Sequence, residues 1–237
     1  MEKEAMLNRI RASLETAMLP AASYELPARP PSLEGSVGIP GDPKSLRAAF
    51  IAEAQSLSAQ VYSPDDQAEA IGILLRIVQA NQTEAALVWD EEHLPVPGVW
   101  ETLITHGVQI LDATLPAAGD EATRAVRLAE FDRATVGVTG ALAGLANTGS
   151  LALLSGPGRG RLASLLPPVH VALLPVASLC PDMATFLAAH PGVVRQASNL
   201  VFISGPSRTA DIEQVLTLGV HGPRELHVVL IPPEDHD

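Results

Sequence analysis

The chain has 237 residues, of which 47% are hydrophobic, 3% aromatic and 18% charged, and its formal net charge at pH 7 is −12. The acidic balance excludes the basic stripe that binding to nucleic acid needs, although a few arginines and backbone N–H groups can still hold a small anion locally. No apolar stretch reaches the roughly 20 residues of a membrane span, and the N-terminus lacks the pattern of a signal peptide. The sequence therefore predicts a soluble, cytoplasmic protein.

Cys180 is the single cysteine of the chain. One cysteine allows no intramolecular disulfide, which fits a reducing compartment. One thiolate also cannot hold an iron–sulfur cluster, which usually needs four cysteine ligands. We therefore expect that this chain binds no cofactor alone and that any iron–sulfur cluster lies on a partner protein.

The N-terminal part divides into two segments. Apolar residues recur near a 3.6-residue period over 2–19 and predict a helix that Pro20 ends. The stretch 20–42 is dense in proline and glycine, which favours an extended linker. The expected organisation is a helical arm at 1–19, this linker, and an α/β domain at 43–237.

From Asp42 onward the pattern becomes regular. Asp42 before Pro43 is typical of a helix start, and the stretch 63–66 starts a second helix in the same way. Further helices are predicted at 96–105, 120–129, 181–189 and 209–218. Strands are predicted at 85–89, 107–111, 134–138, 150–154, 169–174, 200–204 and 227–231. Continuous apolar strands that alternate with helices predict an α/β fold with a mainly parallel sheet flanked by helices.

A polar loop follows the predicted strand at 200–204, and ligands of open parallel sheets bind just beyond the carboxyl ends of strands. The candidate ligand-binding residues in this loop, which runs over 204–211, are Ser204, Gly205, Ser207, Arg208 and Thr209. Exposed N–H groups at the start of the predicted helix, together with the arginine, can form an anion cradle. In the alternative interpretation the hydroxyl side chains only cap the helix, and the arginine pairs with an aspartate one turn on.

A second candidate loop runs over 155–161, after the predicted strand at 150–154. It contains three glycines, together with Arg159 and Arg161, which can each bind a carboxylate or phosphate through two hydrogen bonds. The loop does not match a phosphate-binding loop, because no Lys-Ser/Thr pair follows at the required spacing. A solvated surface turn is the alternative.

The glycine-rich stretch 137–150 lies between two predicted strands. Its glycine spacing does not fit a dinucleotide fingerprint. Asn147, Thr148 and Gly149 can line a polar pocket mouth, or they can form an ordinary turn before a strand.

The histidines give no metal-site pattern, so the sequence predicts no metal ligands and leaves the catalytic residues unknown. His221 and His227 lack a third ligand at a usual spacing. His170 interrupts an apolar strand, where a hydrogen-bonded core histidine is the expectation. Cys180 reads as a small buried apolar residue.

Three segments resemble the lactate utilisation protein C branch of the LUD domain family. They read GRLASLLPPVHVAL at 160–173, ISGPSRTADIE at 203–213 and LGVHGPRELHV at 218–228. The segments occur in order, and the resemblance is clear from about residue 134 to residue 231. The N-terminal helical arm also looks like that family.

The resemblance implies a fold like that of sugar-phosphate isomerases, CoA transferases and formyltetrahydrofolate cyclo-ligases. It also implies a role in oxidising L-lactate to pyruvate beside iron–sulfur lactate-utilisation proteins, with a small anionic metabolite bound at the loops 155–161 and 204–211. The family commonly has Ala-Glu-Thr-Gly where this chain has Ala146-Asn147-Thr148-Gly149. An amide does not titrate, so Asn147 cannot replace a carboxylate base, and independent catalysis by this chain is in doubt.

Alternatives from other classes stay open at this point. The chain can be a non-catalytic or co-catalytic subunit of the lactate-oxidising system, a stand-alone enzyme, or a sensor. The last two would bind a phosphorylated, CoA or folate-type metabolite, as related folds do. Assembly into a homo-oligomer is also left open.

Overall fold

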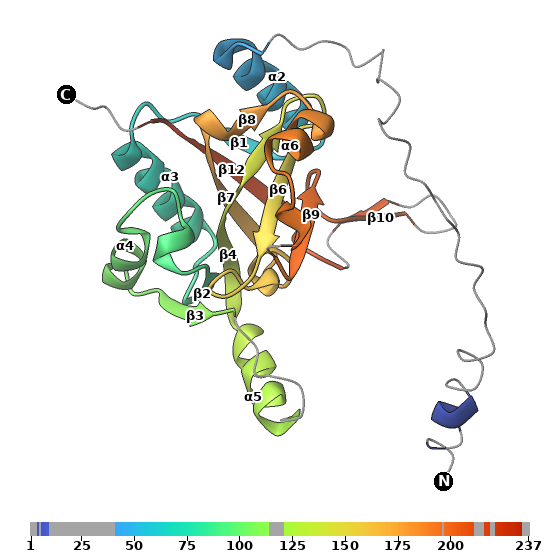
Figure 1. Cartoon of the computed structure of the whole chain (residues 1–237). Coiled ribbons are helices and arrows are strands. Elements are labelled where there is room, and N and C mark those ends of the chain that lie inside the picture. Colours follow the sequence, from blue (N-terminus) through green and yellow to red (C-terminus); the bar gives the residue numbers. More distant parts are fainter. Residues whose placement is uncertain are drawn as a thin grey trace. The chain divides into compact units, whose positions relative to one another are not determined.

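A computed structural model of the chain describes residues 4, 6–9, 41–113, 121–195, 197–210, 216–218 and 221–233 (Figure 1). The chain divides into two compact units, Met1–Val37 and Gly38–Asp237. In the first unit, residues 4 and 6–9 are helical, as the pattern at 2–19 predicts. The rest of that predicted helix and most of the predicted linker lie outside the described residues.

The helices of the second unit start where the sequence indicates. Asp42 caps the first by accepting a hydrogen bond from the Ser45 N–H at 3.0 Å, and Asp66 caps the next through the Glu69 N–H at 2.7 Å. The helices are α2 (Pro43–Ser56), α3 (Gln67–Ala80), α4 (Val99–Thr105), α5 (Glu121–Phe131) and α6 (Met183–Ala189), with short 3-10 turns η1 (Glu91–His93), η2 (Arg161–Ser164), η3 (Val176–Ser178) and η4 (Val193–Arg195). No helix in the described ranges is long and apolar enough to cross a membrane.

A six-stranded sheet forms the centre of the second unit. Its strands are β1 (Gln60–Tyr62), β2 (Ala85–Val88), β3 (Gln109–Asp112), β4 (Ala134–Gly140), β7 (Val169–Pro175) and β12 (Glu225–Ile231). They run in the order β1-β12-β7-β4-β2-β3, and every pair of neighbours is parallel. In Figure 1, α3 and α4 lie on one side of this sheet, and β6, β9 and α6 lie on the other. The predicted parallel sheet flanked by helices is therefore confirmed.

A second sheet of four strands corrects part of the prediction. It consists of β5 (Ala143–Leu145), β6 (Ser150–Ser155), β8 (Leu179–Cys180) and β9 (Asn199–Ile203), in the order β8-β5-β6-β9. Strand β6 is antiparallel to both β5 and β9. The strands predicted at 150–154 and 200–204 exist, but they lie outside the parallel sheet. A continuous apolar run indicates burial of both faces and does not specify the direction of pairing.

The helix predicted at 209–218 is wrong in its described part. There β10 (Arg208–Ala210) pairs antiparallel with β11 (Leu216–Leu218), and residues 211–215 lie outside the described residues. Thr209 stands opposite Thr217 in this ladder. β-branched residues favour strands, and this preference outweighs the helix-start signal of Ser207.

Close backbone contact fixes η2 on the main sheet. A Cβ added at Gly137 in β4 would lie 1.7 Å from the carbonyl oxygen of Ala163 in η2. Only a glycine lets the two segments approach this closely. The contact anchors the C-terminal end of the 155–161 loop, which precedes η2.

Candidate functional site

The two loops predicted to share one anionic ligand lie at opposite ends of β6. Ser155 ends the strand and leads into the 155–161 loop. Ser150 starts the strand, and its Oγ lies 2.6 Å from the Oγ of Ser204 in the other loop. The six residues of β6 span five steps of about 3.3 Å, which separates the strand ends by about 17 Å. One small anion cannot contact both loops, so the expected shared site is wrong.

The 155–161 loop covers the carboxyl edge of the main sheet. Beyond β2, the N–H of Asp90 donates to the Gly158 carbonyl at 2.8 Å, and Trp89 Nε1 donates to the Gly160 carbonyl at 3.1 Å. Beyond β3, Ala113 packs closely on Gly160: a Cβ added at Gly160 would lie 2.5 Å from the carbonyl oxygen of Ala113. This is the edge at which open parallel sheets bind their ligands.

Arg159 stands between two cavities at this edge. The edge cavity, about 280 Å³ in volume, is lined by Glu92 and His93 among other residues. The arginine cavity, about 360 Å³ in volume, is lined by Ser155, Arg159, Arg161, Ser198 and Asn199 among others. Arg159 belongs to both linings, so its side chain can serve a ligand in either cavity.

The Arg159 side chain is half-buried, and its Nε is fully buried without a hydrogen-bond partner in the described part of the chain. An unsatisfied buried donor costs about 1–3 kcal/mol, and more when it is charged. A carboxylate or phosphate oxygen would satisfy it with a charge-assisted hydrogen bond. Arg161 is exposed, so the 155–161 loop carries one half-buried and one solvent-facing guanidinium.

His93 is a candidate that the sequence interpretation missed. Its Nε2 lies 3.2 Å from the Pro157 carbonyl and 3.5 Å from a Glu92 carboxylate oxygen. When Nε2–H donates to that carbonyl, Nδ1 keeps a lone pair that can accept a proton. The run Asp90-Glu91-Glu92-His93 at the end of a predicted strand was the available signal.

Glu91, beside these residues, has a structural role instead. Its carboxylate accepts hydrogen bonds from the N–H groups of Val99 and Trp100, both at 2.9 Å. These are the first two residues of α4, whose capping residue Gly98 has no side chain. A carboxylate at this position satisfies helix N–H groups and complements the helix dipole.

The 204–211 loop lies by a different cavity. Ser204, Gly205 and Ser207 line a space of about 260 Å³ together with His170, and we name it the His170 cavity. Arg208 turns elsewhere, because its Nη2 donates to the Leu57 carbonyl at 2.6 Å and to Ser58 Oγ at 2.7 Å. The predicted cradle of helix N–H groups and Arg208 does not form, since β10 replaces the helix and the guanidinium binds the end of α2.

The residues Asn147, Thr148 and Gly149 form the turn between β5 and β6 and line none of these three cavities. The Asn147 N–H donates to the Pro181 carbonyl at 3.0 Å, and Thr148 Oγ1 accepts from Ser150 Oγ at 2.8 Å. Gly149 has a φ of +58°, and a Cβ there would lie 2.3 Å from the backbone nitrogen of Ala54. Their geometry is that of an ordinary turn packed against α2.

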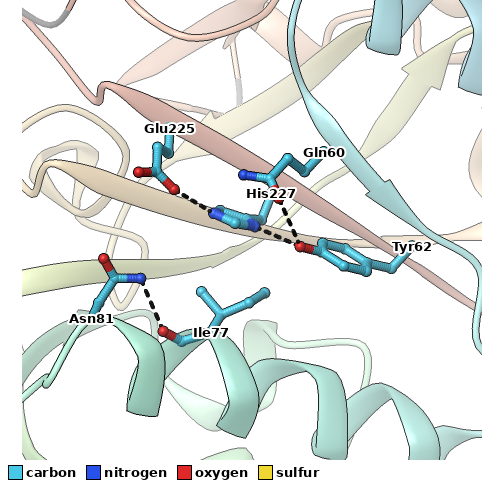
Figure 2. Close-up of polar contacts among 6 residues, drawn as sticks. All are labelled: Gln60, Tyr62, Ile77, Asn81, Glu225 and His227. Carbon is cyan, nitrogen blue, oxygen red and sulfur yellow. Dashed lines mark hydrogen bonds and ion pairs between the residues drawn. The ribbon is translucent and has the colours of Figure 1, made fainter.

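His227 joins a separate polar cluster on the other face of β12 (Figure 2). The Tyr62 hydroxyl lies 3.0 Å from His227 Nδ1, and His227 Nε2 lies 3.2 Å from a Glu225 carboxylate oxygen. Burial lowers the pKa of His227, although Glu225 opposes that shift. Burial raises the pKa of Tyr62, and the negative charge of Glu225 adds a smaller increase. The cluster connects β1 to β12. No group of three potential metal-ligating side chains occurs among the described residues.

Fold and site together define an α/β domain with an arginine-lined cleft at the carboxyl edge of a parallel sheet. The chain belongs to the LUD domain family, whose sequence pattern matches residues 47–231. The resemblance noted from the three sequence segments is thereby confirmed. The matched range contains every cavity described above.

Individual relatives agree with this assignment. Lactate utilization protein C of Halalkalibacterium halodurans is 36% identical over 160 residues, which are 65% of this chain and 66% of the relative. Lactate utilization protein C of Anoxybacillus flavithermus is 32% identical over 169 residues, which are 70% of this chain and 71% of that protein. The chain thus spans about two thirds of the length of these relatives.

A solved structure supports the fold. The crystal structure of a DUF162 family protein from Deinococcus radiodurans has a TM-score of 0.59 and 23% sequence identity. The likeness covers 81% of this chain and 99% of the other. At this identity the comparison supports the α/β architecture alone.

Proposed function

We propose that this chain acts in lactate utilisation by binding L-lactate through Arg159 at the carboxyl edge of its sheet. The observation that carries the proposal is that Arg159 lines both the edge cavity and the arginine cavity and that its buried Nε has no hydrogen-bond partner among the described residues. The name of the relatives, lactate utilization protein C, supports the choice of lactate.

The chemistry of the edge cavity suits a small hydroxy acid. The planar guanidinium of Arg159 matches a carboxylate bidentately. His93 lines the same cavity and can accept a hydrogen bond from the substrate hydroxyl, or its proton during oxidation. The arginine would thus orient the acid group while the imidazole receives the proton.

Oxidation of lactate to pyruvate breaks the hydroxyl O–H bond and the adjacent C–H bond, forms the keto C=O bond, and releases two protons and two electrons. His93 would take the hydroxyl proton, the proton from carbon would pass to water, and we propose that partner proteins accept the two electrons. A single cysteine cannot ligate an iron–sulfur cluster, so clusters on separate iron–sulfur proteins would take one electron each. In this proposal the chain is a cytoplasmic, substrate-binding subunit of the oxidising system. The likeness to sugar-phosphate isomerases, CoA transferases and formyltetrahydrofolate cyclo-ligases is part of the same proposal.

A second candidate function rests on the arginine cavity. Two arginines, two serines and one asparagine among its lining residues would also suit a phosphoryl group. A stand-alone enzyme or sensor for a phosphorylated, CoA or folate-type metabolite would use this cavity.

Calorimetric titration of the full chain with L-lactate tests the proposal. We expect saturable binding that Arg159→Gln weakens by roughly 10- to 100-fold, because hydrogen bonds to charged groups contribute about 1.5–3 kcal/mol. Arg76→Gln is the matched control, since Arg76 is exposed on α3 and lines none of the three cavities. Equal affinity of the wild-type chain and Arg159→Gln would refute the role of Arg159. Binding of inorganic phosphate without binding of lactate would favour the second candidate.

A further inference from the structure

We propose that the His170 cavity is a second binding site, for an uncharged and largely apolar small molecule that carries one hydrogen-bonding group. The site lies at the far end of β6 from Arg159 and does not depend on lactate binding. Its volume is about 260 Å³.

The cavity has a buried floor and an exposed mouth. His170 is 1% exposed and Leu226 is 2% exposed, and these residues lie at the start of two neighbouring parallel strands. Leu165, Ser204 and His221 also line the cavity and are exposed, so they mark its mouth. The space therefore leads from solvent to the imidazole.

The imidazole at the floor lacks one partner. His170 Nε2 lies 2.9 Å from Thr139 Oγ1, whereas Nδ1 is fully buried and has no hydrogen-bond partner among the described residues. The expectation of a satisfied core histidine therefore fails for this nitrogen. A polar atom without a partner destabilises the fold, and a carbonyl or hydroxyl group of a ligand would satisfy it.

The lining determines the charge of the ligand. Its described lining residues include no lysine, arginine, aspartate or glutamate, and Arg208 of the adjacent loop is hydrogen-bonded to the end of α2. Burial, with a smaller contribution from His227, lowers the pKa of His170 to about 3, so its imidazole is neutral at pH 7. A charged ligand would lose its hydration without a counter-charge, which excludes a carboxylate or phosphate here.

The walls determine the rest of the ligand. Most of the lining residues that are neither serine nor histidine are apolar, and they include Phe202, Ile203 and Leu226. Such walls gain free energy when an apolar ring or chain displaces water from them. The competing explanation is that a single bound water hydrogen-bonds to Nδ1. Such a water would leave most of the apolar wall in contact with solvent.

Three aromatic probes of similar size separate these explanations. Phenol has a ring and one hydroxyl group, benzoate adds a negative charge, and benzene lacks the polar group. We expect saturable calorimetric binding of phenol to the full chain, with a change in the NMR resonances of the His170 imidazole. Benzoate should bind at least about tenfold more weakly than phenol, because its charge would lose hydration without a counter-charge. Benzene should also bind at least about tenfold more weakly, because it cannot form the hydrogen bond.

Two variants locate the binding. Leu165→Trp should narrow the mouth and weaken phenol binding at least about fivefold. Leu166→Trp is the matched control, because Leu166 is 39% exposed against 36% for Leu165 and does not line the cavity. No saturable binding of phenol would overturn the proposal in favour of bound water. Benzoate binding as tight as phenol binding, or equal phenol affinity of the two variants, would also overturn it.

Discussion

Gly137→Ala is expected to destabilise the domain by more than about 3 kcal/mol, a large part of the 5–15 kcal/mol that stabilises a typical protein. The added methyl group would lie 1.7 Å from the Ala163 carbonyl oxygen and 2.8 Å from its carbon. These are backbone atoms of η2, so no side-chain rotation relieves the overlap. The free energy of unfolding in urea, followed by circular dichroism, measures the effect.

Gly72→Ala is the matched control for this substitution. Gly72 lies inside α3, and the nearest atom to an added Cβ is 3.8 Å away, at the end of the Arg76 side chain. Alanine in a helix interior should stabilise the domain by about 0.5–1 kcal/mol. If the free energy of unfolding of Gly137→Ala lies within about 1 kcal/mol of the wild-type value, η2 does not pack directly on β4. In that case η2 does not anchor the loop that carries Arg159.

His170→Gln is expected to flatten the dependence of stability on acid. His170 has a pKa of 6.5 in the unfolded chain and about 3 in the folded one, because burial disfavours the charged imidazole. Between these values the unfolded state binds more protons, so the free energy of unfolding falls as the pH falls. From pH 7 to pH 4 this single group should account for about 3 kcal/mol of lost stability.

The experiment compares urea unfolding of the wild type and the variant at a series of pH values. Glutamine does not titrate, and its amide can still hydrogen-bond with Thr139 Oγ1, so the difference between the two curves isolates His170. Parallel curves for wild type and His170→Gln would show that His170 is not buried in its neutral form.

Local signals in the sequence predicted much of the main sheet and its helices. Asp42 with Pro43 predicted the start of α2, and the stretch 63–66 predicted the start of α3, which Asp66 caps, since capping depends on neighbouring residues. Apolar runs predicted β2, β4, β7 and β12, because such a run is also a local signal in the sequence. The three-residue strand β1 gave no pattern, because its pairing depends on β12, far along the chain. The three-residue strand β5 pairs with the next strand, β6, but is too short to give an apolar run.

The candidate site was predictable in part. Arg159 and Arg161 stood out as cations in a glycine-rich loop, and the loop does lie at the carboxyl edge. The helix expected after Ser207 was wrong, because pairing with β11 decides that segment. The placement of His93 depends on a contact with Pro157, and the placement of the His170 ring depends on a contact of its Nε2 with Thr139, and both partners are distant in sequence. Such contacts leave no local signal.

The most direct test of the central claim is lactate-dependent reduction of a dye by the purified chain, alone and mixed with iron–sulfur lactate-utilisation proteins. The proposal predicts activity in the mixture alone, with loss of that activity for Arg159→Gln and retention for Arg76→Gln. Activity of the isolated chain, or full activity of the Arg159→Gln mixture, would contradict a substrate-binding role for this cleft.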